Sequence, residues 1–355
     1  MPTMTDEIER VARKVCSKSL GIRPKEKILI VSNQYGDLPL ISENIYRAAE
    51  SFGASPTLLY QPEKTHFDFM EDAVRQALLS DPDVIVSLPK FKLGKDKIGS
   101  KFKYKRGKRD YSHYLRVLLG EKMARAVWST NMTKERFIGP VDADFDEIKR
   151  DSRKVGSYFM SADAIHISSK NGTDFTAKIS KRPHYCIGNI KKPGSSGNLP
   201  PGEVFLTPVL NSSSGTLVID GVVSTSDESM IPKEPVILHV TAGSISNIEG
   251  GTEAEKLSDA LKKAEKKSIE MGKNPKNNKK ISEIAVGLNK KARIVPNITE
   301  AEKYRGSFHF ALGYDWDGQI DSLIHLDQVI RYPTIVLKSL GTEVFTLIRE
   351  GELKI

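Results

Sequence analysis

The chain has 355 residues, of which 39% are hydrophobic and 28% charged, as in globular proteins of about two domains. No run of 18 apolar residues occurs, which argues against a membrane-spanning helix, and the acidic N-terminal segment lacks the apolar core of a secretory signal. We therefore expect a cytoplasmic protein that has no membrane partner and whose two cysteines, Cys16 and Cys186, are reduced.

The formal charge of +9 is concentrated in one basic segment, residues 91–109. It contains nine Lys or Arg and one acid, Asp96, so it carries +8 and leaves the rest of the chain near +1. Phe91, Phe102 and Tyr104 lie between the charges, a pattern compatible with nucleic acid or an acidic partner. A solvated insertion is the simpler interpretation, and it is the one that we favour.

The first half of the chain alternates short apolar runs with segments of helical spacing. The expected strands are residues 27–31, 57–60, 83–88 and 124–129, and the expected helices are residues 38–52, 67–79 and 145–153. This order predicts a parallel sheet with right-handed crossovers, an α/β domain of flavodoxin-like or Rossmann-like type over residues 1–160. A G-x-G-x-x-G element is missing, so dinucleotide binding has no support.

After residue 160 strands dominate. Asn171-Gly172 between two alternating segments predicts a β-hairpin. Further strands are expected at residues 204–210, 216–219, 236–240, 244–248, 281–288, 334–337 and 345–348, with one clear helix at residues 254–270. Residues 161–355 are therefore predicted to form an α+β domain of mainly antiparallel strands.

Candidate metal ligands gather between residues 302 and 327. Glu302, His309, His325 and Asp327 combine imidazoles with carboxylates, a donor set that suits a divalent metal ion. Because one residue separates His325 from Asp327, both side chains leave the same face of an extended strand. Strand alternation also separates His309 from its phenylalanine neighbours, as expected of a strand that lines a pocket.

Two further acids lie in apolar surroundings. Glu203 follows a Pro- and Gly-rich turn at the start of a strand, where it is either a capping residue or a ligand. Glu283 lies inside the apolar run of residues 281–288, and burying an unpaired carboxylate costs several kcal/mol. A metal ion would neutralise Glu283, as would Arg293 or a lysine of a nearby loop.

Four ordered motifs between about residues 195 and 330 resemble the thermophilic-type leucyl aminopeptidases, the aminopeptidase T and S family of dinuclear metallopeptidases. These motifs cover residues 197–205, 282–289, 302–313 and 325–327. The resemblance implies a homodimer that hydrolyses N-terminal residues from a peptide substrate. It also implies two divalent metal ions, zinc or cobalt, with manganese or iron as further options.

The resemblance assigns a role to each candidate residue. Glu203 would bind one metal, together with His325 and Asp327, while Glu302 and His309 would bind the second. Glu283 would bridge the two ions or act as the catalytic base on the shared water. The chain departs from the family in two respects. Glu302 lies two residues farther from His309, and the loop after His309 is shorter, so Tyr314 is only a candidate for the catalytic tyrosine.

Two other functions are open besides the aminopeptidase. A ring-opening dihydroxypyridine dioxygenase has the same fold and keeps counterparts of His325 and Asp327, and two His with one carboxylate form the facial triad of non-haem Fe(II) oxygenases. Against it, Glu203 and Glu283 would be surplus buried acids. The third possibility is a binding protein without turnover that uses the basic segment as its contact surface.

Overall fold

The computed structural model describes residues 3–355 and divides into two compact units. The first comprises the chain up to Ala143 together with Gly188–Pro201, and the second comprises Asp144–Ile187 and Gly202–Ile355. The expected division at residue 160 falls at the end of helix α7 (Phe145–Ser161), which clusters with the second unit. Among the described residues, no helix combines the length and apolar character needed to cross a membrane.

The first unit is built on a five-stranded sheet with the order β10-β6-β3-β1-β2, in which every paired strand is parallel. Its elements are α1 (Met4–Lys14), η1 (Val15–Leu20), β1 (Lys27–Ser32), α2 (Leu38–Ser51), β2 (Ser55–Tyr60), α3 (Asp72–Leu79), β3 (Val84–Leu88), α4 (Lys97–Phe102), β4 (Tyr104–Arg106), β5 (Arg109–Tyr111), α5 (Tyr114–Gly120), β6 (Arg125–Trp128), α6 (Lys134–Ile138), η2 (Pro140–Asp142) and β10 (Ser196–Asn198). The order β2-β1-β3-β6 is that of flavodoxin-like folds, so the predicted α/β class is confirmed.

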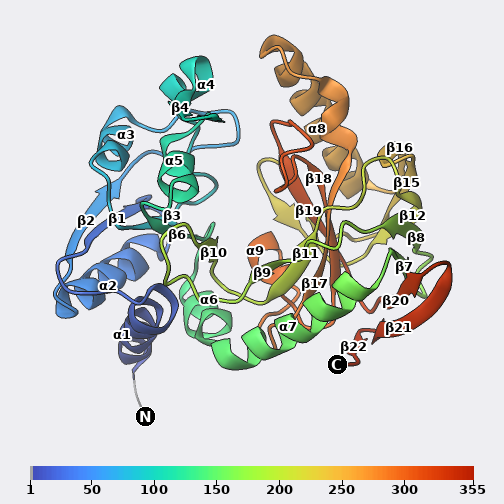
Figure 1. Ribbon diagram of the computed structural model, residues 1–355, viewed down its shortest axis with the longest axis horizontal. Coiled ribbons are helices and arrows are strands. Elements are labelled where there is room, and N and C mark those ends of the chain that lie inside the picture. Colours follow the sequence, from blue (N-terminus) through green and yellow to red (C-terminus); the bar gives the residue numbers. More distant parts are fainter. Residues whose placement is uncertain (1–2) are drawn as a thin grey trace. The chain divides into compact units, whose positions relative to one another are not determined.

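Apolar side chains alternate between the two faces of this sheet, and each face is buried in its own core. Ile28 and Ile30 of β1 join a core with α1 and α2, while Leu29 and Val31 join a second core with α3 and α5. Helices therefore cover the two faces separately (Figure 1). Strands that are buried on both faces read as the continuous apolar runs seen in the sequence.

The basic segment is structured. It contains α4 and the β4–β5 hairpin, whereas the sequence predicted only a solvated insertion. Asp96 is fully buried and caps α4, because its carboxylate accepts the backbone N–H groups of Ile98 and Gly99 at 3.1 and 2.9 Å. The same carboxylate accepts the N–H of Tyr114 at 3.1 Å, which ties the segment to α5. A single acid among nine cations was thus the signal for local order.

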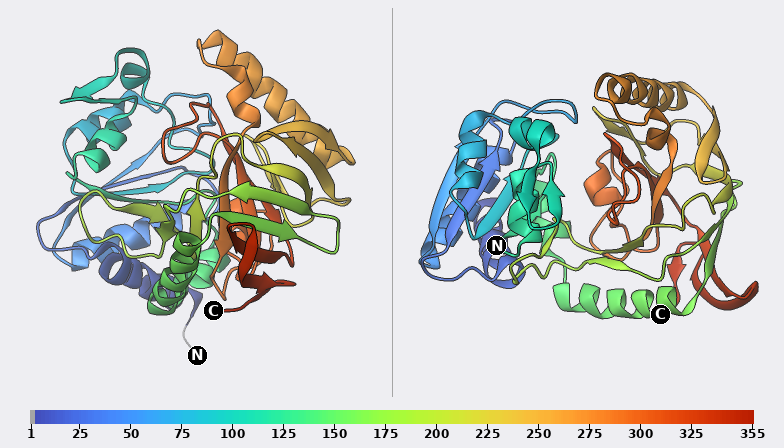
Figure 2. Two further views of the ribbon diagram at one scale, coloured as in Figure 1. Left: turned by 45° about the vertical axis from the view of Figure 1, so that its right-hand side comes forward. Right: turned by 45° about the horizontal axis from the view of Figure 1, so that its top comes forward.

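The second unit contains two large antiparallel sheets, with strand orders β19-β18-β17-β11-β9 and β16-β15-β12-β8-β7-β20-β21-β22, and the small antiparallel pair β13-β14. Besides α7 its elements are β7 (Ala164–Ser168), β8 (Asp174–Lys178), β9 (His184–Cys186), β11 (Glu203–Leu206), β12 (Ser214–Ile219), β13 (Val223–Ser224), β14 (Ser229–Met230), β15 (Val236–Thr241), β16 (Ser244–Glu249), α8 (Thr252–Glu270), η3 (Pro275–Lys279), β17 (Ile281–Gly287), α9 (Ile298–Ala301), β18 (Phe308–Gly313), β19 (His325–Ile330), β20 (Thr334–Ser339), β21 (Thr342–Arg349) and β22 (Glu352–Leu353). The helix α8 packs beside β15 and β16 (Figure 2). The predicted α+β class is confirmed, including the hairpin at Asn171-Gly172.

Candidate metal centre

In the second unit, one face of the five-stranded sheet β19-β18-β17-β11-β9 carries the candidate ligands. Across three neighbouring strands, Glu283 of β17 lies opposite Ala311 of β18, which lies opposite Asp327 of β19. Directly opposed residues of antiparallel strands share a face, so Glu283 and Asp327 flank a small side chain. His309 and His325 belong to the same face, because each lies two residues from a member of this row. The alanine between the acids leaves space above the sheet.

The register also places Glu203 on this face. It is the first residue of β11 and lies opposite Gly287 of β17, and it is buried with 5% exposure. Position 287 requires glycine for a steric reason. A Cβ there would come within 2.1 Å of the Tyr304 carbonyl oxygen and 2.8 Å of the Lys303 carbonyl carbon. The missing side chain lets the chain after α9 cross close to the sheet.

That crossing segment delivers Lys303, a residue the sequence analysis did not single out. Lys303 is fully buried, and its Nζ lies 2.5 Å from Glu203 Oε1 and 2.5 Å from Glu302 Oε1. Burial lowers the pKa of the Lys303 ammonium, but the two carboxylates raise it more, well above its ordinary value. These surroundings therefore favour the charged form of the side chain. A lysine beside Glu302 in a matching motif was the available signal, but the motif's spacing drew attention only to the acid.

The pKa values of Glu203 and Glu302, the two acids that contact Lys303, shift in opposite directions. Burial raises the pKa of Glu203, but Lys303 and His309 outweigh burial and hold that pKa below its ordinary value. For Glu302 burial prevails over Lys303, and the pKa rises to about 7. Glu203 is therefore the acid that stays ionised.

His309 and Glu283 carry polar atoms without a hydrogen-bond partner in the described part of the chain. His309 Nε2 lies 3.1 Å from Glu203 Oε2 and 3.6 Å from Glu283 Oε1, but both ring nitrogens lack hydrogen-bond geometry to any partner. Glu283 Oε2 is also unsatisfied. Burial raises the pKa of Glu283, whereas burial lowers that of His309 and the surrounding carboxylates Glu203 and Glu283 raise it to about 10. Buried unsatisfied donors and acceptors are rare and point to a missing partner.

His325 is oriented by the backbone. Its Nδ1 donates to the carbonyl of Tyr314 at 2.8 Å, which directs Nε2 toward Asp327 Oδ1 at 3.2 Å and Glu283 Oε2 at 3.7 Å. Burial lowers the pKa of His325, but Asp327 raises it well above its ordinary value, and His325 in turn lowers the pKa of Asp327 despite burial. Fixing one ring nitrogen so that the other faces inward is typical of metal-ligating histidines.

The structure thus brings all six predicted ligands into one cluster. Their donor atoms form two groups, each with all atoms within 4.8 Å of one another: Glu203, Glu302 and His309 in one, and Glu283, His325 and Asp327 in the other. The predicted alternative partner of Glu283 is wrong, because Arg293 instead places its Nε 3.2 Å from Glu300 Oε1. Tyr314 lies beside the second group, with its ring centroid 4.8 Å from that of His325.

Aromatic rings border the cluster, a feature the sequence analysis did not identify. His184 and Phe205 stack with centroids 5.1 Å apart, and Phe205 lies 6.1 Å from Trp316. Trp316 lies 6.4 Å from His325 and 5.9 Å from Tyr314. We call these four rings, His184, Phe205, Tyr314 and Trp316, the aromatic wall. The rings belong to β9, β11 and the loop before β19. These segments are distant in the sequence, and the order of strands in the sheet brings them together.

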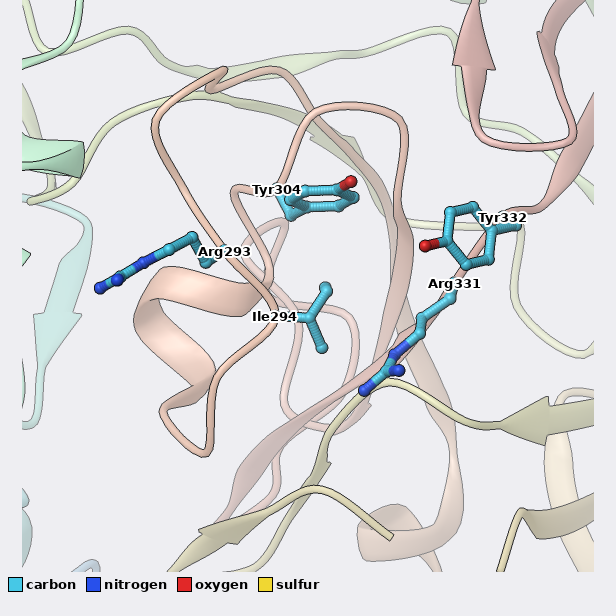
Figure 3. A pocket seen from close by; sticks show the side chains of 5 residues that line it. All are labelled: Arg293, Ile294, Tyr304, Arg331 and Tyr332. Atoms are coloured by element: carbon cyan, nitrogen blue, oxygen red, sulfur yellow. The ribbon is translucent and has the colours of Figure 1, made fainter.

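A pocket of about 200 Å³ lies elsewhere in the second unit (Figure 3). Its lining residues are Arg293, Ile294, Tyr304, Arg331 and Tyr332. None of them is a candidate ligand.

Comparisons with known proteins test the expected function. The family model described as NicX, 2,5-dihydroxypyridine 5,6-dioxygenase, matches residues 141–350. A curated 2,5-dihydroxypyridine 5,6-dioxygenase of Pseudomonas putida KT2440 is 31% identical over 123 residues, a match that spans 33% of this chain and 34% of that protein. The chain thus aligns with about a third of the length of this relative.

Two solved structures share the fold over nearly the whole chain. The 2,5-dihydroxypyridine dioxygenase of Pseudomonas putida KT2440 has a TM-score of 0.73 at 19% identity, covering 99% of this chain and 98% of the other. Wild-type AmpT of Thermus thermophilus, an aminopeptidase T, has a TM-score of 0.70 at 13% identity, covering 99% and 100%. At these identities both likenesses establish the fold alone.

These findings overturn the main functional expectation. The resemblance to the aminopeptidase T family holds for the fold, but the assignments as aminopeptidase, hydrolase and protease, and the peptide substrate, are wrong. The motifs misled because aminopeptidase T and the dioxygenase share a fold, and a shared fold does not determine the reaction. The family model covers more than half of the sequence, including every residue of the cluster, and the chain therefore belongs to the 2,5-dihydroxypyridine 5,6-dioxygenase family.

Proposed function

We propose that this protein is a non-haem iron(II) dioxygenase that opens an electron-rich, hydroxylated aromatic ring, with 2,5-dihydroxypyridine as the first substrate to test. The observation that carries the proposal is the cluster itself. Within the region matched by the family model, two imidazoles and carboxylates share one face of a sheet. Two imidazoles with a carboxylate are the donor set of non-haem iron oxygenases.

The residues present fit such an ion. Glu283, His325 and Asp327 form the group whose donors converge, and His309 Nε2 faces Glu283 from the other side. The unsatisfied atoms of Glu283 and His309 are those that an ion would satisfy. We assign Glu283, His325 and Asp327 as ligands, with His309 as a further donor. Ferrous iron supplies the activation of dioxygen.

Lys303 removes one argument against this function. As a dioxygenase, the chain would have two surplus buried acids, Glu203 and Glu283. Glu203 is neutralised by the Lys303 ammonium at 2.5 Å, so it does not require a metal ion. Only Glu283 then needs an ion, and it lies beside His325 and Asp327.

The aromatic wall supports a flat substrate. Rings stacked beside the cluster offer faces against which a planar ring can pack. At its edge His184 Nε2 lies 3.1 Å from Asp317 Oδ1, and the His184 side chain is 38% exposed, so solvent reaches this pair. The wall would orient the ring, and the His184–Asp317 pair would offer hydrogen bonds to a substrate hydroxyl.

The test is oxygen uptake by iron-loaded protein. Purified protein is reconstituted anaerobically with Fe(II), mixed with 2,5-dihydroxypyridine and exposed to oxygen. We expect loss of the ring's ultraviolet absorbance with one O₂ consumed for each ring opened. Asp327→Ala is the matched control and is expected to lose turnover by at least about tenfold. The benzene analogue 2,5-dihydroxybenzoate tests whether the ring nitrogen matters. No oxygen uptake with either substrate at full iron occupancy would contradict the proposal.

A further inference from the structure

Lys303 is an internal cation placed among potential metal ligands. Its side chain has 0% exposure, and its Nζ contacts one oxygen of Glu203 and one of Glu302, each at 2.5 Å. These two acids belong to the group that His309 completes, with donor atoms within 4.8 Å. The ammonium therefore lies against two of the three residues that could hold an ion there.

The backbone fixes this position. The Lys303 N–H donates to the Glu300 carbonyl at 3.0 Å, and the Lys303 carbonyl accepts the N–H of Asn289 at 2.8 Å. Gly287 on the neighbouring strand leaves the space that this crossing requires. With the main chain held on both sides and the side chain enclosed, the ammonium has no solvent-exposed alternative position.

We propose that the Lys303 ammonium takes the place that a second metal ion would need and so keeps metal away from Glu203 and Glu302. The ammonium already supplies positive charge to Glu203 and Glu302, and a divalent ion at the same oxygens would be repelled by it. The inference rests on the proposed function only for the presence of one ion, at Glu283, His325 and Asp327. It gives a reason why a cluster with donors for two ions would hold one.

The test counts ions in the wild-type chain and in Lys303→Ala. Metal-free protein is titrated with Mn(II), and bound metal per chain is measured by mass spectrometry and electron paramagnetic resonance. We expect one Mn(II) in the wild type, with the spectrum of an isolated ion. In Lys303→Ala, which frees the carboxylates and opens space, we expect a second ion. Two ions about 3.5–4 Å apart would be magnetically coupled and would weaken the isolated-ion signal.

The control is Lys279→Ala, which removes a surface lysine of the same unit that pairs with Glu265 at 2.8 Å. It should bind one ion, like the wild type. Two ions in the wild type would overturn the proposal, as would a folded Lys303→Ala chain that still binds only one. If Lys303→Ala does not fold, Lys303→Ser, a second small uncharged replacement, decides: a second ion supports the proposal, and a single ion in the folded chain overturns it.

The outcomes separate this inference from the proposed function. A wild-type chain with one ion but no oxygen uptake on dihydroxylated rings would contradict the dioxygenase and leave the role of Lys303 intact. A chain that binds two ions and opens the ring would support the dioxygenase and contradict the role of Lys303.

Discussion

Tyr314 acts on the cluster through its backbone. Its carbonyl accepts the Nδ1–H of His325 at 2.8 Å, and this bond sets which ring nitrogen faces Asp327. Only the aminopeptidase resemblance made Tyr314 a candidate for a catalytic tyrosine. Because Tyr314→Phe keeps both the carbonyl and the ring, we expect its affinity for Fe(II) or Mn(II) to stay within about twofold of the wild type, measured by metal titration, whereas loss of such a support typically costs about 10–100-fold.

The matched variant for that prediction is Asp315→Ala. Asp315 shapes the loop that presents the Tyr314 carbonyl, since its carboxylate accepts the N–H groups of Gln319 and Ile320 at 3.1 and 2.7 Å. We expect metal affinity to fall by about tenfold or more in Asp315→Ala. A Tyr314→Phe chain that loses affinity as strongly as Asp315→Ala would show that the phenol, not the carbonyl, supports the centre.

Some residues of the cluster could be predicted from the sequence and others could not. The spacing of His325 and Asp327 predicts a shared face because strand alternation is local, and Glu283 stood out as a charge in an apolar run. Lys303 did not, because a lysine is expected at the surface and only tertiary packing buries it between two acids.

At the scale of elements, α5 (Tyr114–Gly120) contains a pH-sensitive cap at its start. His113 Nδ1 accepts the N–H of Leu115 at 3.1 Å, and Nε2 lies 3.3 Å from the Gly94 carbonyl, so the neutral tautomer with Nε2–H satisfies both contacts. Protonating Nδ1 would replace an acceptor with a donor. Burial accordingly lowers the pKa of His113 to about 4.

This cap predicts a loss of stability at acid pH. The unfolded chain binds a proton at His113 below its ordinary pKa of 6.5, while the folded chain does so only near pH 4, so stability is lost as pH falls through this interval. Between roughly pH 7 and pH 5 the loss from this group is up to about 2 kcal/mol, measured by urea unfolding. His113→Asn keeps a capping acceptor without titrating, and should lose less stability over that range. Equal losses in both chains would contradict the assignment.

The elements themselves were largely predictable, because apolar runs and turn residues are local signals. The strand around residues 27–31 and the hairpin at Asn171-Gly172 appear where expected. Helix α3 begins at Asp72 instead of near residue 67, and β10 was missed, since three residues, Ser196–Asn198, form a strand only by pairing with β6. Pairing between distant segments has no local signature.

For the whole molecule, the sequence predicted both fold classes and a convergent set of candidate ligands, but it favoured the aminopeptidase over the dioxygenase that the family model supports. The solved peptidase and dioxygenase share the fold, and imidazole with carboxylate ligands suits several divalent metals, so neither fold nor donor type names the reaction. What separates them here is the match of residues 141–350 to the dioxygenase family model. Neither the pairing partner of Glu203 nor the aromatic wall follows from spacing along the chain.

The two units should respond differently to metal. Both groups of candidate ligands found among the described residues belong to the second unit. An ion that binds only the folded second unit stabilises it by about 2.7 kcal/mol when its free concentration is 100 times Kd. We therefore expect a chelator to lower the temperature of one unfolding transition in calorimetry and to leave the transition of the α/β unit in place.

Asp327→Ala supplies the control for that experiment. It removes a ligand in the second unit, so its calorimetric trace should be the same with and without metal, and should match the chelated wild type apart from the cost of the substitution. Amide hydrogen exchange assigns the transitions, because metal should slow exchange in β17 to β19 and not in β1 to β3. Metal that protected β1 to β3 instead, or that still stabilised Asp327→Ala, would place the ion outside this cluster.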